Sequence, residues 1–440
     1  MPVWQNDRMR AKPTHRSGGA IFLALAFAVS GCGSTVSPAT PGTSVASAGP
    51  TSVASAGSSG SAAQSTKAVL TAIEGQVESV RGLTAASPVT PVLLDPTGLV
   101  DKLTAINTAE TNHQALADES RLFIHLGLLP AGSSLEQMEL ALDADQVVGF
   151  YDPSSKGLYV LSASGGVGPA EKLTFSHEYT HALQDQNFGL DKLAIDTADQ
   201  GDRDLARTAL PEGDATLEMT QWSEQYLSAL DLLVIAGQSL NSTQTEQLAN
   251  APAILRQDLM FPYDQGLAFV ESAYASGGWA AVNKIYTRPP SSTAQILHPE
   301  LYKSVVEPVG VTLPAVPKAL GSGWKATMQD TMGEFQLQVW LEGEKPTDAQ
   351  TAAATAAIDG WAGDRVGLYE GPNGAWVVVL RTAMTDDPGV QAFDEAAADR
   401  LATLPGYAIA CGEPGFVDVL AGSSESVVDS FGICPVPSLH

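Results

Sequence analysis

The chain is poor in basic residues. Lysine and arginine together number 23, against 49 aspartate and glutamate residues, and the 440-residue chain carries a formal net charge of -26. A chain this acidic repels phosphate backbones and has no basic stripe for binding in a nucleic-acid groove. We therefore expect no nucleic-acid partner.

Cysteine is also scarce, with three residues at Cys32, Cys411 and Cys434. None of them has a CxxC partner, which excludes a zinc knuckle. Cys411 and Cys434 form an even pair near the C-terminus, and in an exported protein such a pair predicts a disulfide. The alternative is two buried free thiols.

The apolar run at residues 20–29 is too short to cross a bilayer comfortably. A basic stretch with four Lys and Arg residues between positions 8 and 16 precedes it. This order is typical of a secretory signal peptide and not of a membrane anchor. We predict that residues 1–31 are the signal peptide.

The end of this run, Val29-Ser30-Gly31-Cys32, resembles the lipobox of bacterial lipoproteins. The resemblance implies that Cys32 is acylated and becomes the mature N-terminus, which places the protein at the outer face of the bacterial cell membrane. An ordinary signal peptide that contains a cysteine is the alternative.

Residues 33–65 consist almost wholly of Ser, Gly, Ala, Thr, Pro and Val, with the near-repeat TSVASAG at Thr43 and Thr51. Such a composition buries too little apolar surface to fold. We predict a lipidated, flexible tether over residues 32–66 and a folded catalytic domain over residues 67–320.

The folded part is predicted to be α+β and mainly helical. Residues 146–162 have two β-rich runs around the turn sequence DPSSKG, which predicts a hairpin. Pro169 marks a predicted helix start, and no Gly or Pro follows it before Gly189, which predicts a long helix.

A separate small α+β unit with the disulfide is predicted over residues 321–440. Two strands flank the turn sequence GPNG, and three helical segments accompany them. The predicted strands are residues 366–370 and 375–382, and the predicted helices are residues 332–341, 349–358 and 394–404.

His177, Glu178 and His181 form an HExxH pattern in the predicted long helix. Residues four apart share one helical face, so both imidazoles can bind one metal ion while Glu178 points to its open side. Zn²⁺ held in this way polarises water and a carbonyl, and the carboxylate acts as general base. The alternative is a metal-free helix whose histidines serve only packing.

Catalytic zinc sites usually have a third protein ligand. The extended metzincin pattern is excluded, because Gln184 stands where it needs glycine and Asn187 where it needs histidine. The remaining option is a carboxylate from another helix.

The segment LPEGDATLE provides that carboxylate, with Pro211 at a predicted helix start and Glu212 in its first turn. It resembles the second helix of gluzincin peptidases, which implies that Glu212 is the third ligand. Gluzincins commonly carry an aspartate four residues later, where this chain has Thr216. Asp214 is the alternative ligand, as in aspzincins.

Four further residues are candidates for supporting roles. Asp185 lies one turn after His181 and could orient an imidazole. Tyr263, His298 and Tyr302 could stabilise a developing oxyanion by donating a hydrogen bond. A solvated surface acid, core aromatics and a turn cap are the plain structural alternatives.

The predicted hairpin resembles the edge strand of zincins, which pairs with an extended substrate; this would make Tyr151 or Tyr159 a substrate neighbour. More widely, the chain resembles uncharacterised bacterial lipoproteins assigned to the zinc metallopeptidases. The similar stretches are GFYDPSSKGLYV, HEYTHALQDQNF, PEGDAT, FPYDQGLAFV, PPSSTAQILHPELY and GWAGDRVGLYE.

These features predict an exported zinc metallopeptidase with one Zn²⁺ ion and a peptide or protein substrate. Water activated by Glu178 at the zinc would be the nucleophile. Two alternatives stay open. One is a non-catalytic surface lipoprotein, and the other is a zinc amidase that acts on cell-wall peptides.

Overall fold

The structure is a computed structural model. It describes residues 22–25, 59–110, 112–162, 166–195, 197–240, 243–316 and 318–434. Helices dominate and two small sheets complete the fold, which confirms the predicted α+β, mainly helical class. No helix in the described ranges combines the length and apolar character that crossing a membrane requires.

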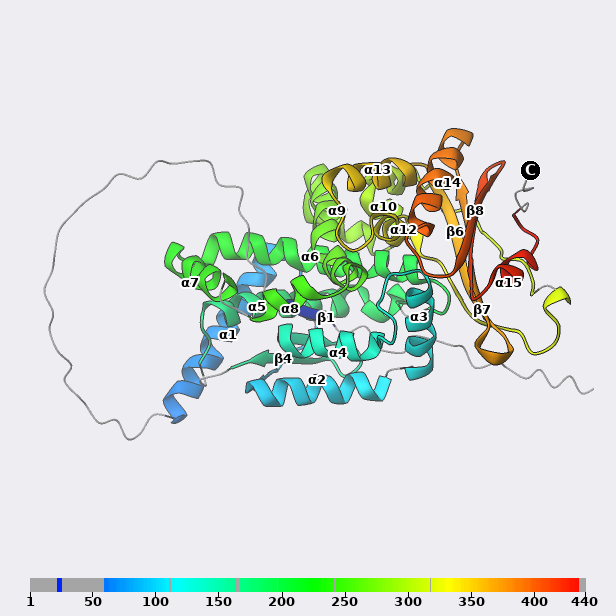
Figure 1. The fold of residues 1–440 in the computed structure, drawn as a ribbon. Coiled ribbons are helices and arrows are strands. Elements are labelled where there is room, and N and C mark those ends of the chain that lie inside the picture. Colours follow the sequence, from blue (N-terminus) through cyan, green and yellow to red (C-terminus); the bar gives the residue numbers. More distant parts are fainter. Residues whose placement is uncertain are drawn as a thin grey trace, which may run out of the picture.

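Residues 59–316 form what we call the helical region (Figure 1). Its elements in chain order are α1 (Ser59–Arg81), β2 (Pro91–Leu94), α2 (Pro96–Glu110), α3 (His113–His125), α4 (Leu135–Gln146), β3 (Val147–Asp152), β4 (Gly157–Leu161), α5 (Pro169–Phe188), the 3-10 turn η1 (Leu190–Leu193), α6 (Gly201–Tyr226), α7 (Ala229–Leu240), α8 (Thr243–Asn250), α9 (Ala253–Ile285), α10 (Thr293–Leu297) and α11 (Pro299–Lys303).

The start of α1 differs from the predicted tether. The helix begins at Ser59, and Thr66 is already buried, so the tether ends earlier than residue 66. Helix formation over these small residues relies on the packing of the later part of α1, where Leu70, Ile73 and Val77 enter the core. Cys32 lies outside the described residues.

The predicted hairpin is present as β3 and β4, paired antiparallel with Gly149 opposite Val160. Strand β2 lies parallel to β4 on one side. On the other side, β1 (Phe22–Leu25), a segment of the predicted signal peptide, pairs antiparallel with β3. The sheet order is β1-β3-β4-β2, so β3 has an edge that accepts an extended strand.

Helix α6 starts earlier than predicted. Pro211 lies in its interior, ten residues after its first residue, Gly201. The cap residue Gln200 makes no side-chain capping bond, so the true start lacks the usual sequence signal. The helix packs closely against α9. Gly213 makes this possible, because a Cβ at this position would collide with the backbone of Gly266.

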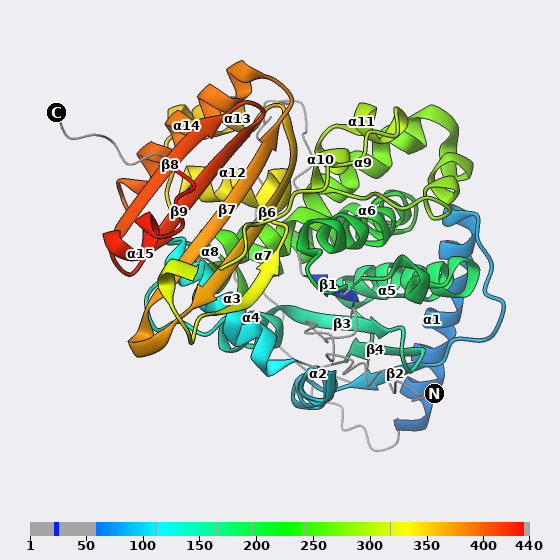
Figure 2. The ribbon, with the colours of Figure 1, turned by 90° about the vertical axis from the view of Figure 1, so that its right-hand side faces the viewer.

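Residues 325–434 form what we call the sheet region (Figure 2). Its strands have the order β5-β6-β7-β9-β8, and all neighbouring strands are antiparallel. The 3-10 turn η2 (Lys318–Leu320) precedes it. Its elements are β5 (Lys325–Asp330), α12 (Gly333–Glu342), α13 (Asp348–Ile358), β6 (Trp361–Glu370), the 3-10 turn η3 (Pro372–Gly374), β7 (Trp376–Met384), α14 (Asp387–Leu401), β8 (Tyr407–Glu413), β9 (Phe416–Gly422) and α15 (Glu425–Asp429).

The central strand β7 is buried on both faces. Val378 and Leu380 belong to the main core, which is continuous with that of the helical region. Val377 and Val379, which alternate with them, belong to a second core beside α15. This alternation is the period of a strand, and it explains why this segment reads as an uninterrupted apolar run.

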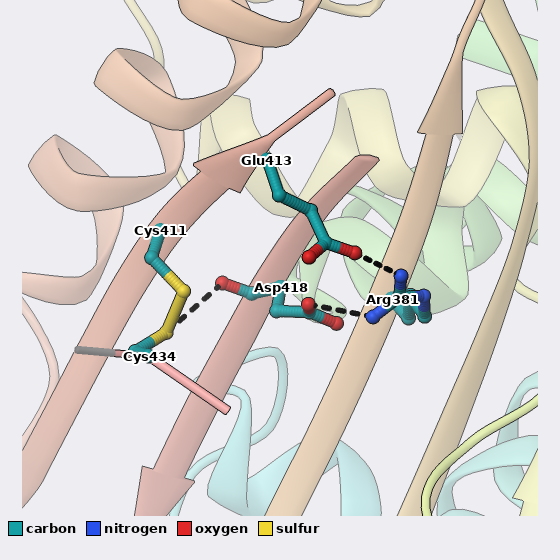
Figure 3. The surroundings of a disulfide bond; sticks show 5 residues. All are labelled: Arg381, Cys411, Glu413, Asp418 and Cys434. Carbon is teal, nitrogen blue, oxygen red and sulfur yellow. Dashed lines mark hydrogen bonds and ion pairs between the residues drawn. A yellow bond between two sulfur atoms is a disulfide. The ribbon is translucent and has the colours of Figure 1, made fainter. Parts of the chain in front are cut away.

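The predicted disulfide between Cys411 and Cys434 is confirmed (Figure 3). It links strand β8 to the segment after α15, with 5.6 Å between the two Cα atoms. Sγ of Cys434 lies 3.9 Å from the carbonyl oxygen of Asp418. The bridge therefore fastens the described C-terminal end to the edge strand of the sheet.

Candidate metal centre

Helix α5 is buried on all sides where it carries the HExxH pattern. Every residue from Leu173 to Asp185 is buried, although many of them are polar. A fully buried helix is normally apolar all round, so these polar side chains need partners inside the protein. His177, Glu178 and His181 are 2%, 0% and 0% exposed.

The partner of the two histidines is Glu212 on α6. Nε2 of His177 lies 3.0 Å from Nε2 of His181. Oε2 of Glu212 lies 3.1 Å from the first nitrogen and 3.4 Å from the second. Three potential ligand atoms from two helices therefore converge on one point, and this group could hold a metal ion.

These distances fit a small divalent ion. Ligand atoms around tetrahedral zinc, each about 2.0–2.1 Å from the metal, stand roughly 3.3 Å from one another. The three observed spacings are close to that value. Two imidazoles and one carboxylate are also a ligand set that zinc commonly uses in catalytic sites.

The charge states suit metal binding. Burial lowers the pKa of His177, and His181 adds to this effect while Glu212 opposes it. Burial alone would raise the pKa of Glu212, but His181 and His177 hold it below the usual value. The site therefore favours a neutral His177 and an ionised Glu212, the forms that bind metal.

The group that orients His181 is Gln184 and not Asp185. Nδ1 of His181 lies 2.9 Å from Oε1 of Gln184, whose Nε2 donates to the carbonyl oxygen of Pro211 at 2.9 Å. Gln184 thus connects α5 to α6 next to the ligands. The Asp185 carboxylate instead accepts bonds from Tyr151 and Lys156 of the hairpin.

Asp214, the alternative third ligand, is directed elsewhere. Its two oxygens accept hydrogen bonds from Arg81 at 2.6 and 2.9 Å and from the hydroxyl of Tyr286 at 2.7 Å. The structure therefore favours Glu212 over Asp214 as the ligand. On a helix, residues two apart point in nearly opposite directions.

Strand β3 passes directly beside Glu178. A Cβ on Gly149 would lie 2.8 Å from Cγ2 of Thr174 and 3.5 Å from Cγ of Glu178. Only a glycine lets the strand approach the helix this closely. Strand β3 is therefore next to the glutamate of the HExxH pattern, and β1, which pairs with the edge of β3, also contacts α5.

A cavity of about 380 Å³ adjoins the site, with Glu212 and Tyr263 in its wall. The ring of Tyr263 lies 6.2 Å from that of His177. The other two predicted stabilisers have different partners. His298 lies 2.6 Å from Glu334, and the hydroxyl of Tyr302 donates to the carbonyl of Arg288.

Among the described residues that line this cavity, none is Lys, Arg or His. Burial raises the pKa of one lining carboxyl, Asp204, to about 6. The wall is therefore rich in carboxyl groups, and three of them, Asp118, Asp199 and Asp204, pair with arginines that do not line the cavity. Its acidic members are Asp118, Glu119, Glu139, Asp199, Asp204, Glu212, Asp258 and Asp330.

Gln184 and Arg81 are parts of the site that the sequence does not predict. Gln184 lies three residues after His181 and so on the same helical face, and this spacing is the signal that could have predicted the contact. Arg81 had no such signal, because it meets α6 only through the tertiary fold.

Two known proteins or families are similar to parts of the chain. A family model described as a domain of unknown function, DUF8575, matches residues 322–423, within the sheet region. No curated protein matches the chain. A crystal structure from Chloroflexus aurantiacus, described as "a putative hydrolase with a novel fold", is 18% identical and has a TM-score of 0.34. That match covers 58% of this chain and 93% of the other.

Proposed function

We propose that the protein is a zinc-dependent hydrolase that cleaves peptide bonds outside the cytoplasm. The observation that carries this proposal is the buried His177, His181 and Glu212 group, with Glu178 on the same turn of α5. A purely structural zinc site would normally be closed by four protein ligands. Three ligands beside a general base are the arrangement of a catalytic site.

Zinc in such a site supplies a Lewis acid that lowers the pKa of water to about 7. The protein supplies the proton transfers and the positioning. Glu178 takes the proton from the attacking water and passes it to the leaving amine. Tyr263 lies in the cavity wall with its ring 6.2 Å from that of His177, and in this proposal its hydroxyl donates a hydrogen bond to the oxyanion.

The edge of β3 is the proposed binding site for the substrate backbone. The pairing of β1 with β3 supports this, since an extended segment fits that edge in antiparallel register. Backbone pairing aligns a peptide independently of its sequence. Because Gly149 contacts α5 next to Glu178, a peptide on this edge would run past the general base.

The test is a comparison of Glu178→Gln with Glu218→Gln. Both glutamates are fully buried, but Glu218 lies outside the metal centre, where it accepts a bond from Thr180. Burial raises the pKa of Glu218 well above its usual value, so glutamine closely resembles its neutral form.

With zinc bound, Glu178→Gln should hydrolyse casein or a peptide library about 100- to 10,000-fold more slowly than the wild type. Glu218→Gln should keep its activity. Equal activity of Glu178→Gln and the wild type would remove the catalytic proposal and leave a non-catalytic metal protein.

We also propose that acylated Cys32 holds the protein at the outer face of the cell membrane. The support is the lipobox-like sequence at residues 29–32 and the tether that follows it. Cell fractionation of a Cys32→Ser variant tests this. The variant should move from the membrane fraction to the soluble exported fraction, and retention in the membrane fraction would contradict the anchor.

A further inference from the structure

Arg81 and Asp214 form an ion pair that is sealed from solvent, with 0% exposure of both side chains. Nε of Arg81 donates to Oδ1 of Asp214 at 2.6 Å, and Nη2 donates to Oδ2 at 2.9 Å. A bidentate pair of this kind fixes the orientation of the two side chains as well as the distance between them. It joins the last residue of α1 to the middle of α6.

Residues at the C-terminal end of α9 hold this pair in place. Asn283 accepts a second bond from Nη2 of Arg81 at 2.8 Å. The guanidinium carbon lies 4.3 Å from the centre of the Trp279 ring, and Tyr286 donates to Asp214. The arginine therefore has little freedom to move, and three helices meet at its side chain.

The same part of α1 also holds the helix that carries the histidines. The hydroxyl of Tyr179, within the HExxH pattern, donates to Glu78 at 3.0 Å. Nε1 of Trp222 on α6 donates to Gln76 at 3.1 Å. The last turns of α1 thus contact both ligand-bearing helices, α5 and α6.

The rotation of α6 about its axis decides where Glu212 points. Side-chain atoms lie about 5–6 Å from a helix axis, so a rotation of about 10° moves them by roughly 1 Å. Metal–ligand distances tolerate only about 0.2 Å. Asp214 is two residues from Glu212, so an anchor on Asp214 restrains this rotation directly.

We propose that Arg81 is a positioning residue for the metal centre: through Asp214 it fixes the rotation of α6 and so aims Glu212 at His177 and His181. The proposal rests on the metal-binding part of the proposed function and is independent of peptide hydrolysis. It gives α1 an indirect role in metal binding, through Asp214 of α6.

The experiment measures zinc affinity by competition with a chromophoric chelator, and the absorption spectrum of the Co²⁺ form, in four variants. Arg81→Met removes the bidentate pair but leaves the buried Asp214 carboxylate without its arginine, which can prevent folding. The double variant Arg81→Met/Asp214→Asn removes both charges, so that no unpaired charge is left in the interior. Arg81→Lys keeps the positive charge but cannot make the two parallel hydrogen bonds of the guanidinium group. Arg381→Met is the control: it removes a partly exposed arginine that pairs with Asp418 and Glu413 in the sheet region (Figure 3).

The double variant should fold, as judged by circular dichroism and its melting temperature, yet bind zinc about 10- to 100-fold more weakly and show an altered Co²⁺ spectrum. Arg81→Lys should be intermediate, and Arg381→Met should match the wild type. Wild-type zinc affinity in a folded double variant would overturn the proposal. Absence of zinc binding by the wild type would instead defeat the proposed function itself.

Discussion

The helical region and the sheet region bury polar groups in different ways. The helical region places charged and ionisable side chains deep in its interior and pairs them between helices, as in Arg81 with Asp214 and Glu212 with two histidines. The sheet region buries alternating apolar residues on both faces of β7 and is closed by a disulfide. Its buried carboxylates Asp364 and Asp418 are bonded to backbone amides and to an arginine, respectively.

The difference indicates where function lies. Buried charges cost free energy unless they are fully paired, so a concentrated set of them needs a reason other than stability. Apolar strands and a disulfide stabilise a fold without providing chemistry. We infer that metal binding belongs to the helical region and that the sheet region supports it.

Metal removal should have the largest effect, and it should fall on the helical region. With zinc at about a thousandfold excess over its dissociation constant, binding adds about 4 kcal/mol to the unfolding free energy. Chelation should therefore lower the melting temperature, and it should abolish hydrolysis. Scanning calorimetry with and without EDTA measures this effect. Superimposable curves would contradict a zinc site that is coupled to folding.

Removal of the disulfide should have the next largest effect and should leave the metal centre intact. The two cysteines are 23 residues apart, and closing a loop of this size stabilises by about 3 kcal/mol. The Cys411→Ser/Cys434→Ser protein should lose about that much in urea unfolding and bind zinc as before. A large fall in its zinc affinity would show that the two regions are coupled.

The contact between the two regions should be sensitive to pH through Asp202. Burial raises the pKa of Asp202 to about 7. The nearby carboxyl groups of Asp364 and Glu334 contribute to this rise in pKa, whereas hydrogen bonds from Thr293 oppose it. The folded protein then binds this proton below about pH 7, while the unfolded chain binds it only near pH 4. Stability from this group should thus rise as the pH falls from 7 towards 4.

Asp202→Asn should remove that dependence. From pH 7 to pH 5, the unfolding free energy of the wild type should rise by about 2 kcal/mol more than that of the variant. Urea unfolding at both pH values measures it. Identical pH profiles for the two proteins would show that Asp202 ionises in the folded state as it does in water.

The smallest expected effect concerns substrate charge. The described residues that line the cavity beside Glu212 include eight acids and no basic residue. Arginines outside the lining pair with three of these acids, so the remaining charge should give a small preference for cationic peptides. Peptides with Lys or Arg should have a kcat/KM about tenfold higher than matched peptides with Glu, and the difference should shrink in high salt. An equal or reversed preference would mean that this wall does not face the substrate.

The sequence was most informative where the chemistry is local. The HExxH spacing places two imidazoles on one helical face whatever the rest of the fold does, and the DPSSKG turn marks the hairpin. Glu212 was identified from its neighbours in the sequence, and only the structure shows why Asp214 is unsuitable. The distinction depends on Arg81, which is 133 residues away in the chain.

The errors have the same physical origin. Asp185 follows His181 by one turn, but its carboxylate accepts hydrogen bonds from Tyr151 and Lys156 of the hairpin instead. Pro211 marks a helix start by its own preference, yet α6 runs through it and packs against both α5 and α9. Tertiary contacts decided both cases, and a single sequence does not reveal them.

The most direct test of the account is the number of zinc ions bound per chain and its dependence on Glu212. Metal analysis after dialysis should find one zinc ion per wild-type chain. It should find a large loss in Glu212→Gln and none in Glu218→Gln, a second buried glutamate of α6. A wild-type protein without zinc, or a Glu212→Gln variant that keeps its full complement, would contradict the claim that three side chains from α5 and α6 hold one ion.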